Sequence, residues 1–250
     1  MSESDFQLNS PLGKAILALT REGDYAHPGE EEAIALATVL IEGPARGRVL
    51  DVGCGRGGSA AWLARHGWGP VAGVDIDAES IRLARERYPG LDFRAADVGG
   101  LDALGLEPFD LVFLLTAFYA FPDQPLALKQ MRAVCREGGT LLMMDYARPT
   151  RQPPPPELGA EIGHPVVLET LTADLAEAGW RLQTLEDWTP RFVGWYARLL
   201  NRFRARETEI LRLAGPEWHA HVLRWYGDLH RALQEGRLGG VALTACAARD

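Results

Sequence analysis

Residues 48–77 constrain the fold of this chain more than any other stretch. An apolar run at 48–52 leads into a turn with glycine at positions 53, 55 and 57, and a helix-forming run follows at 59–66. A second apolar run at 71–75 ends in Asp75. Strand, turn, helix and strand in this order predict a βαβ unit, which is the building block of a parallel sheet.

The same alternation continues through the first 150 residues. Apolar strands are predicted at 92–95, 109–115 and 140–144, with helices at 79–87 and 124–135 between them. The run at 109–115 is apolar on both faces, which is typical of a buried central strand. The pattern predicts an α/β fold with a doubly wound sheet and helices on both faces.

The second part of the chain follows a proline-rich segment at 149–156. A helix at 170–178 and a strand at 181–187 are predicted next. Two amphipathic helices rich in Trp, Tyr and Arg follow at 192–213 and 216–234, and an apolar strand closes the chain at 239–248.

Composition limits the classes of partner. The formal net charge is −8 and the pI is about 5.3, which argues against a nucleic-acid binder, although residues 191–206 leave a local basic patch open. No signal peptide and no apolar run near the ~18 residues that span a bilayer are evident. We therefore expect a cytoplasmic protein that binds neither nucleic acid nor membrane. The widely spaced cysteines, without a CxxC pair, predict no metal site.

The turn at 51–58 predicts a cofactor site. Glycine lets the backbone turn sharply and approach a ligand closely, and the next helix points its N-terminus into the same space. The pattern D-x-G-x-G-x-G differs from the dinucleotide fingerprint, and no G-x-x-x-x-G-K-[ST] loop is present. Asp51 beside the turn repels a pyrophosphate but can pair with an ammonium. This favours S-adenosylmethionine (SAM), which has an ammonium, a sulfonium and no phosphate.

Two further acids follow later strands. Asp75 can accept hydrogen bonds from both hydroxyls of a ribose, and Asp97 from an adenine amino group. Each alone is more often a turn former or a helix cap. Three acids in order at the ends of strands favour a nucleoside site instead.

These motifs resemble those of the class I SAM-dependent methyltransferases, and among them the small-molecule enzymes of the sugar O-methyltransferase and tocopherol-methyltransferase kind. VLDVGCGRGG (49–58) resembles their first motif, VAGVDID (71–77) the following acidic segment, and FRAADV (93–98) the adenine-contacting segment. FDLVFLLTAFYAF (109–121) and CREGGTLLMMDYA (135–147) are similar to the fourth- and fifth-strand segments. The resemblance covers roughly residues 25–250.

The resemblance implies a Rossmann-like fold with a seven-stranded, mostly parallel sheet whose last strand is antiparallel. It also implies an N-terminal helical flap at 1–45, a SAM-binding core at 46–187 and 236–250, and a helical lid at 188–235. The implied cofactor-binding residues are Asp51, Gly53, Gly55 and Gly57 for the methionine part, Asp75 for the ribose, Asp97 and Val98 for the adenine, Leu115 and Thr116 facing the ligand, and Ile76 as a further contact.

The acceptor site is less defined. Residues 115–119 lack the [DNS]-P-P-[YF] motif of DNA-adenine and protein-glutamine methyltransferases. Phe118 and Tyr119 occupy this position instead. Their side chains either pack in the core or form a wall of the acceptor site near the methyl group. Tyr25 in the flap and Trp195 in the lid are further candidates for substrate contacts. The lid aromatics can equally form its core or a homodimer contact.

Methyl transfer needs alignment of donor and acceptor, and a base only where the acceptor loses a proton. By resemblance, Glu169 aligns with an acidic residue that assists the base in some sugar O-methyltransferases. Arg148 stands where those enzymes have a histidine, so His164 and Tyr146 are the remaining catalytic candidates. The sequence thus predicts methyl transfer from SAM to an O or N atom of a small molecule, with natural-product biosynthesis as one setting. A non-catalytic SAM-binding regulator and an NAD-dependent oxidoreductase stay open as alternatives.

Overall fold

The computed structural model describes residues 6–8, 10–21, 23–41 and 47–248. The predicted boundary between flap and core, at residues 45 and 46, lies outside these ranges. Within them, no helix is both long and apolar enough to cross a membrane.

One twisted sheet organises the molecule, with strand order β3-β2-β1-β4-β5-β8-β7 and with β6 beside β5. The strands are β1 (Val49–Val52), β2 (Val71–Asp75), β3 (Asp92–Ala95), β4 (Phe109–Leu115), β5 (Cys135–Arg148), β6 (Val166–Val167), β7 (Trp180–Asp187) and β8 (Gly239–Ala247). β1 to β5 are parallel, whereas β8 runs antiparallel between β5 and β7. The predicted Rossmann-like sheet is confirmed. In the described part of the chain, the short strand β6 adds an eighth strand to the seven expected.

Both faces of the sheet are buried. In β4, Leu111 and Phe113 belong to one hydrophobic cluster, whereas Val112 and Leu114 belong to the other. Side chains alternate between faces along a strand, so a continuous apolar run is what a strand covered on both sides requires.

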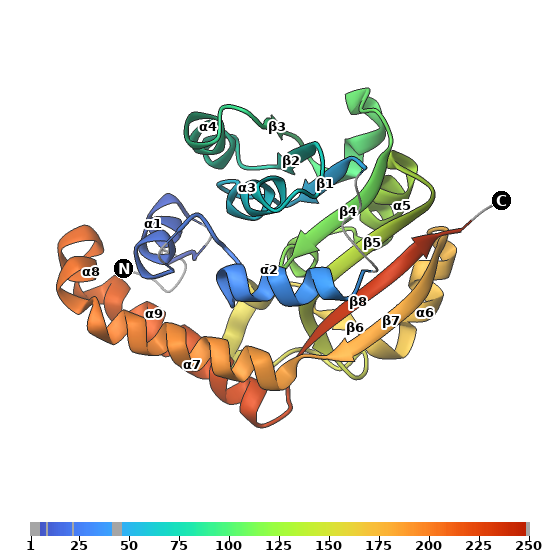
Figure 1. Cartoon of the computed structure of the whole chain (residues 1–250). Helices are drawn as coiled ribbons and strands as arrows, with labels where there is room; N and C mark the ends of the chain where they lie inside the picture. The colour runs from blue at the N-terminus through green and yellow to red at the C-terminus, as the bar shows by residue number, and fades with distance from the viewer. Residues whose placement is uncertain (1–5, 9, 22, 42–46, 249–250) are drawn as a thin grey trace.

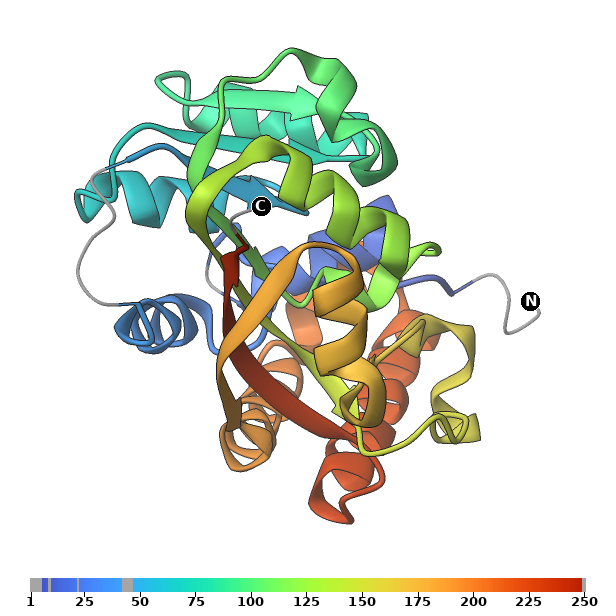
Figure 2. The same cartoon turned by 90° about the vertical axis from the view of Figure 1, so that its right-hand side faces the viewer.

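Helices cover these faces (Figure 1). Those of the flap and core are α1 (Pro11–Thr20), α2 (Glu30–Val39), α3 (Gly58–Arg65), α4 (Ala78–Arg87), α5 (Gln124–Val134) and α6 (Leu168–Glu177), with 3₁₀ turns η2 (Val98–Leu104), η3 (Phe118–Ala120) and η4 (Pro156–Ile162). Figure 2 shows α5 and α6 together on the sheet face turned toward the viewer.

Three helices connect β7 to β8, namely α7 (Thr189–Ala205), α8 (Glu207–Ala214) and α9 (Pro216–Gln234). The sequence pattern predicts one helix where α7 and α8 lie. The chain turns between them at Arg206, whose φ of −104° and ψ of 22° leave the helical region. This turn brings α8 against α1 and α9 and buries Ile210. We call α7, α8 and α9 the lid.

Candidate functional site

A cavity of about 520 Å³ lies at the carboxyl ends of β1, β2 and β4. The sheet ends form one side, and α1, the segment 23–26 and the lid form the others. Lys14 of α1 forms an ion pair with Asp77, just after β2. This contact ties α1 to the sheet edge across the cavity. Ligands of open parallel sheets bind in this position.

The glycine turn shapes the cavity wall. Gly53 lines the cavity with a φ of +73°, and a Cβ there would lie 2.5 Å from the Cβ of Ala117. Gly57, with a φ of +84°, lies behind the wall, where a Cβ would be 2.6 Å from Cζ of Phe93. Both positions need glycine for its left-handed conformation and for close packing. Gly55 also lines the cavity, whereas Gly57 contributes by packing.

Asp75 is held in one orientation at the end of β2. Its Oδ2 accepts from the backbone N–H of Gly55 at 2.8 Å, and its Oδ1 accepts from that of Asp77 at 2.9 Å. The carboxylate lines the cavity, and each oxygen keeps capacity for a second hydrogen bond. This arrangement can receive two vicinal hydroxyls.

Asp51 lies deeper, at the end of β1. It is 3% exposed, and its Oδ2 has no hydrogen-bond partner among the described residues. Burial raises its pKa to about 7, and the neighbouring Asp75 adds to this shift. A buried, unpaired carboxylate oxygen beneath the glycine turn suits the electrostatics of a cationic ligand above it.

The rim beyond β2 is apolar and exposed. Ile76 lines the cavity although it is 73% exposed, and Val98 lies on the same wall. Asp97 lines the cavity and caps η2 by accepting from the N–H of Gly99 at 2.8 Å. Exposed apolar side chains beside a carboxylate suit a flat heterocycle that carries an amino group. Together with the glycine wall and Asp75, these residues fit SAM.

The turn after β4 carries backbone strain. Thr116 lines the cavity with a φ of +46°, and its N–H donates to the carbonyl of Met144 at 2.6 Å. A non-glycine residue in this conformation costs energy and is often found at functional sites. Leu115, predicted to face the ligand, is buried in the core and does not line the cavity.

A buried carboxylate, Asp145 of β5, orders the next turn. Its Oδ2 accepts from the N–H groups of Phe118 and Tyr119 at 2.8 and 3.3 Å, and its Oδ1 accepts from that of Tyr146 at 2.7 Å. Burial raises its pKa to about 7, while these backbone bonds act in the opposite direction. Asp145 therefore fixes the backbone at Tyr119 and Tyr146.

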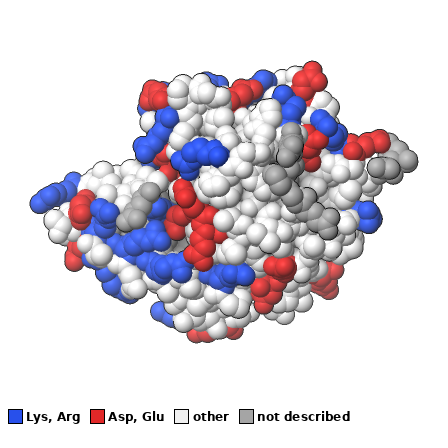
Figure 3. All heavy atoms as spheres, in the orientation of Figure 1, with Lys and Arg blue, Asp and Glu red and all other residues white. Residues whose placement is uncertain are grey.

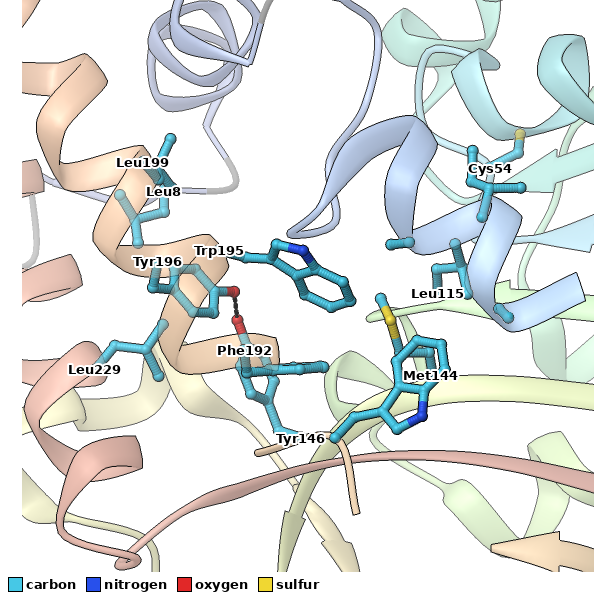
Figure 4. Close-up of a cluster of buried hydrophobic side chains, with 14 of the residues drawn as sticks. Leu8, Cys54, Leu115, Met144, Tyr146, Phe192, Trp195, Tyr196, Leu199 and Leu229 are labelled. Atoms are coloured by element: carbon cyan, nitrogen blue, oxygen red, sulfur yellow. Dashed lines mark hydrogen bonds between the residues drawn. The ribbon is translucent and has the colours of Figure 1, made fainter. Parts of the chain in front are cut away.

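The inner end of the cavity is rich in hydroxyl groups. Tyr119, Tyr146, Tyr196 and Tyr226 line it, and the hydroxyls of Tyr146 and Tyr196 are hydrogen-bonded to each other (Figure 4). Burial is the largest cause that raises the pKa of all four, so they stay protonated at neutral pH. We call this part of the cavity the acceptor end, and the part around Gly53 and Asp75 the donor end.

The structure brings three of the predicted acceptor residues to the cavity. These are Tyr25, which donates to Glu31 at 2.8 Å, Tyr119 and Tyr146. Phe118 and Trp195 lie in the hydrophobic core instead. Trp195 packs on Gly29, where a Cβ would lie 2.5 Å from the indole ring.

The predicted bases Glu169 and His164 lie elsewhere. Both are exposed, and neither lines the cavity. Among the charged residues that the sequence did not suggest and that do line it are Arg21 at the end of α1 and Glu161 in η4. Neither belongs to a motif or an apolar period, so only the folded chain shows their position.

Charges outside the cavity are largely paired. Figure 3 shows basic side chains gathered over the lid, beside an acidic patch. Arg198 pairs with Glu32, and Arg202 pairs with Glu30 at 3.2 Å. The basic segment 191–206, which left a local basic patch open, is thus partly neutralised by α2. Among the described residues, no group of three or more His, Cys, Asp or Glu side chains could hold a metal ion.

Comparison with known proteins agrees with this geometry. Residues 49–139 match the family described as a methyltransferase domain. Methyltransferase GfsG of Streptomyces halstedii is 35% identical over 105 residues, covering 39% of this chain and 37% of GfsG. The match thus spans little more than a third of that relative. The 27-O-demethylrifamycin SV methyltransferase of Amycolatopsis mediterranei is 29% identical over 233 residues, covering 86% of this chain and 84% of the relative.

A solved structure shares the fold over nearly the whole chain. Phosphoethanolamine N-methyltransferase 2 of Haemonchus contortus, in complex with SAM, aligns with a TM-score of 0.85 and 18% identity, covering 98% of this chain and 59% of that protein. Residues 49–139 therefore belong to the methyltransferase-domain family, and the sequence relatives and the shared fold support a class I SAM-dependent methyltransferase.

Proposed function

We propose that the protein transfers the methyl group of SAM to an oxygen or nitrogen atom of a small molecule held between the glycine turn and the lid. The observation that carries this proposal is the continuity of one cavity. Gly53 and Asp75 line one end of it, and Tyr146 and Tyr196 line the other. A donor and an acceptor bound in one space can be aligned, which is the main contribution an enzyme makes to a displacement reaction.

When bound, SAM supplies a methyl group on a positively charged sulfur. We assign Asp75 to the ribose, Ile76, Asp97 and Val98 to the adenine, and the backbone at Gly53 and Gly55 to the methionine part. In this proposal, Asp51 acts electrostatically from below and Thr116 faces the reacting centre. Helix α1 and the lid exclude water from the cavity.

The acceptor proton needs a group to receive it when the nucleophile is a hydroxyl or an ammonium. We propose Glu161 for this role in place of Glu169. Glu161 is half-buried and lines the cavity, and burial raises its pKa above the ordinary carboxyl value. A carboxylate with a raised pKa is a better proton acceptor at neutral pH.

The relatives support both kinds of acceptor atom. One is named for 27-O-demethylrifamycin SV, which supports oxygen and a role in natural-product biosynthesis. The structural neighbour is named as an N-methyltransferase, which supports nitrogen.

The test is the formation of S-adenosylhomocysteine (SAH) from SAM with a panel of phenols, alcohols and amines, measured by mass spectrometry. A thermal-shift measurement with SAH and with NADH accompanies it. We expect stabilisation by SAH and acceptor-dependent turnover. Stabilisation by NADH alone would refute the donor assignment. SAH binding without turnover across the panel would instead support a non-catalytic SAM-binding protein.

A further inference from the structure

Arg21 is a buried cation in the wall of the cavity. It is 2% exposed, and its Nη1 donates to the backbone carbonyl of His27. Its Nε has no hydrogen-bond partner among the described residues. A guanidinium stays charged at any physiological pH and presents five N–H donors in one plane. A buried one with a donor left over therefore lacks an acceptor.

The protein supplies only part of the negative charge that Arg21 needs. Oε1 of Glu30 lies 3.5 Å from Nη1 of Arg21. The same carboxylate accepts from both Nη atoms of Arg202 at 3.2 Å. One carboxylate thus faces two guanidinium groups. Arg202 does not line the cavity, so the unbalanced positive charge faces inward at Arg21.

Neutral hydroxyls surround this cation. Tyr146, Tyr196 and Tyr226 line the same end of the cavity and interact electrostatically with Arg21, and side-chain hydrogen bonds join Arg21 to Tyr196 and Tyr226. Burial keeps their hydroxyls protonated, as described above. Phenol hydroxyls and a guanidinium are all donors toward an anion, and a planar fork of N–H groups matches a carboxylate or phosphate.

Glu161 is the carboxylate of the acceptor end. Both of its oxygens accept from the backbone N–H of Leu8, at 3.2 and 3.3 Å. The cavity therefore offers a cation for an anionic group and a separate carboxylate for a proton. A molecule with an acidic group and a separate hydroxyl or amine could contact Arg21 with the first and Glu161 with the second.

We propose that the acceptor end binds a carboxylate or phosphate group on Arg21, so that the methyl acceptor is an anionic small molecule. This inference rests on the proposed function only for the statement that the bound molecule is the acceptor. The binding of an anion at Arg21 stands on the geometry alone.

The experiment uses the full chain saturated with SAH. Benzoate, phenyl phosphate and inorganic phosphate are the anionic probes, and methyl benzoate and phenol are their neutral counterparts. Binding is measured by calorimetry and by thermal shift. We expect the anions to bind and the neutral counterparts to bind at least tenfold more weakly. The stronger of benzoate and phenyl phosphate identifies which anionic group the site prefers.

Variants locate the site. Arg21→Gln should weaken anion binding by roughly 10- to 100-fold, the range for loss of a charge-assisted hydrogen bond. SAH binding should stay unchanged, and Arg21→Lys should retain part of the anion affinity. Arg198→Gln is the matched control, because it removes a guanidinium that pairs with Glu32 outside the cavity and leaves Glu30 shared as before. It should keep anion affinity within about threefold, far from the loss at Arg21.

Equal binding of methyl benzoate and benzoate, no binding of any anion, or unchanged affinity in Arg21→Gln would overturn the proposal. If Arg21→Gln does not fold, the charged and neutral probes on the wild-type chain decide the question. Anion binding at Arg21 without any methyl transfer would refute the proposed function and keep the site. Methyl transfer to neutral acceptors that persists in Arg21→Gln would keep the function and refute the site.

Discussion

The donor end and the acceptor end of the cavity are built in different ways. At the donor end, Gly53 follows β1, Asp75 ends β2 and Val98 comes shortly after β3. At the acceptor end, Arg21 comes from the end of α1 and Tyr226 from α9, near opposite ends of the sequence. A cofactor site can thus be encoded in short motifs, whereas the acceptor site arises only when distant segments pack together.

The largest effect should come from Gly53→Ala at the donor end. The alanine would have to adopt the left-handed φ of Gly53, and its Cβ would lie 2.5 Å from the Cβ of Ala117. We expect no measurable SAH binding in calorimetry and a loss of about 2–4 kcal/mol in the free energy of unfolding. Gly67→Ala is the control, because Gly67 has a φ of +78° and no neighbour within 4 Å of a Cβ. It should cost about 1 kcal/mol and keep SAH affinity; equal losses in both variants would contradict the argument.

The next effect should come from the acceptor end. Glu161→Gln keeps the shape of the side chain but cannot take a proton, so we expect methyl transfer to slow by roughly 100-fold with unchanged SAH affinity. Glu169→Gln is the matched control, because Glu169 is exposed and outside the cavity. Its turnover should stay at the wild-type level. Steady-state kinetics with slow turnover in Glu169→Gln and wild-type turnover in Glu161→Gln would identify Glu169 as the base instead.

Asp75→Asn should have a smaller effect, confined to the donor end. The amide loses one of the two acceptor oxygens that line the cavity, so SAH affinity should fall by roughly 10- to 100-fold in calorimetry. Asp92→Asn, an exposed change on the neighbouring strand, serves as control. An unchanged dissociation constant in Asp75→Asn would exclude this carboxylate from the ribose site.

Two buried groups near the cavity, His27 and Asp51, should make the stability of the fold respond to pH in opposite directions. Burial lowers the pKa of His27, beside Arg21, to about 3 from 6.5, so the unfolded chain binds the extra proton and stability falls as pH drops from about 6.5 to 3. Burial raises the pKa of Asp51 from 3.8 to about 7. The folded chain then binds the extra proton, and stability falls as pH rises from about 4 to 7.

Between pH 4 and 8, each contribution should amount to about 3–4 kcal/mol. Urea unfolding of His27→Gln and Asp51→Asn between pH 4 and 8 measures them separately. His27→Gln should remove the loss toward acid, and Asp51→Asn the loss toward neutral pH. If the two variants show the same pH profile as wild type, neither buried group controls stability in this range.

The same contrast explains what the sequence could predict. The sheet and the donor end follow from local patterns, because a residue at the end of a parallel strand has a known place in the fold. Phe118 and Trp195 are aromatic in the predicted regions but point into the core, since residue type does not determine the direction of a side chain. Glu161 follows the proline-rich segment, whose path no periodic pattern defines. Its place in the cavity depends on the packing of η4 against α9.

The antiparallel strand β8 has a consequence for how this molecule can change. Asp187, the last residue of β7, pairs with Val241 near the start of β8, so the chain leaves and re-enters the sheet on adjacent strands roughly 5 Å apart. The lid is therefore an insertion whose two ends lie side by side in the sheet. A different insertion that covers the same apolar surface could replace it without altering strand order or the glycine turn. The lid, and with it the choice of acceptor, can thus change while the donor end and the use of SAM stay the same.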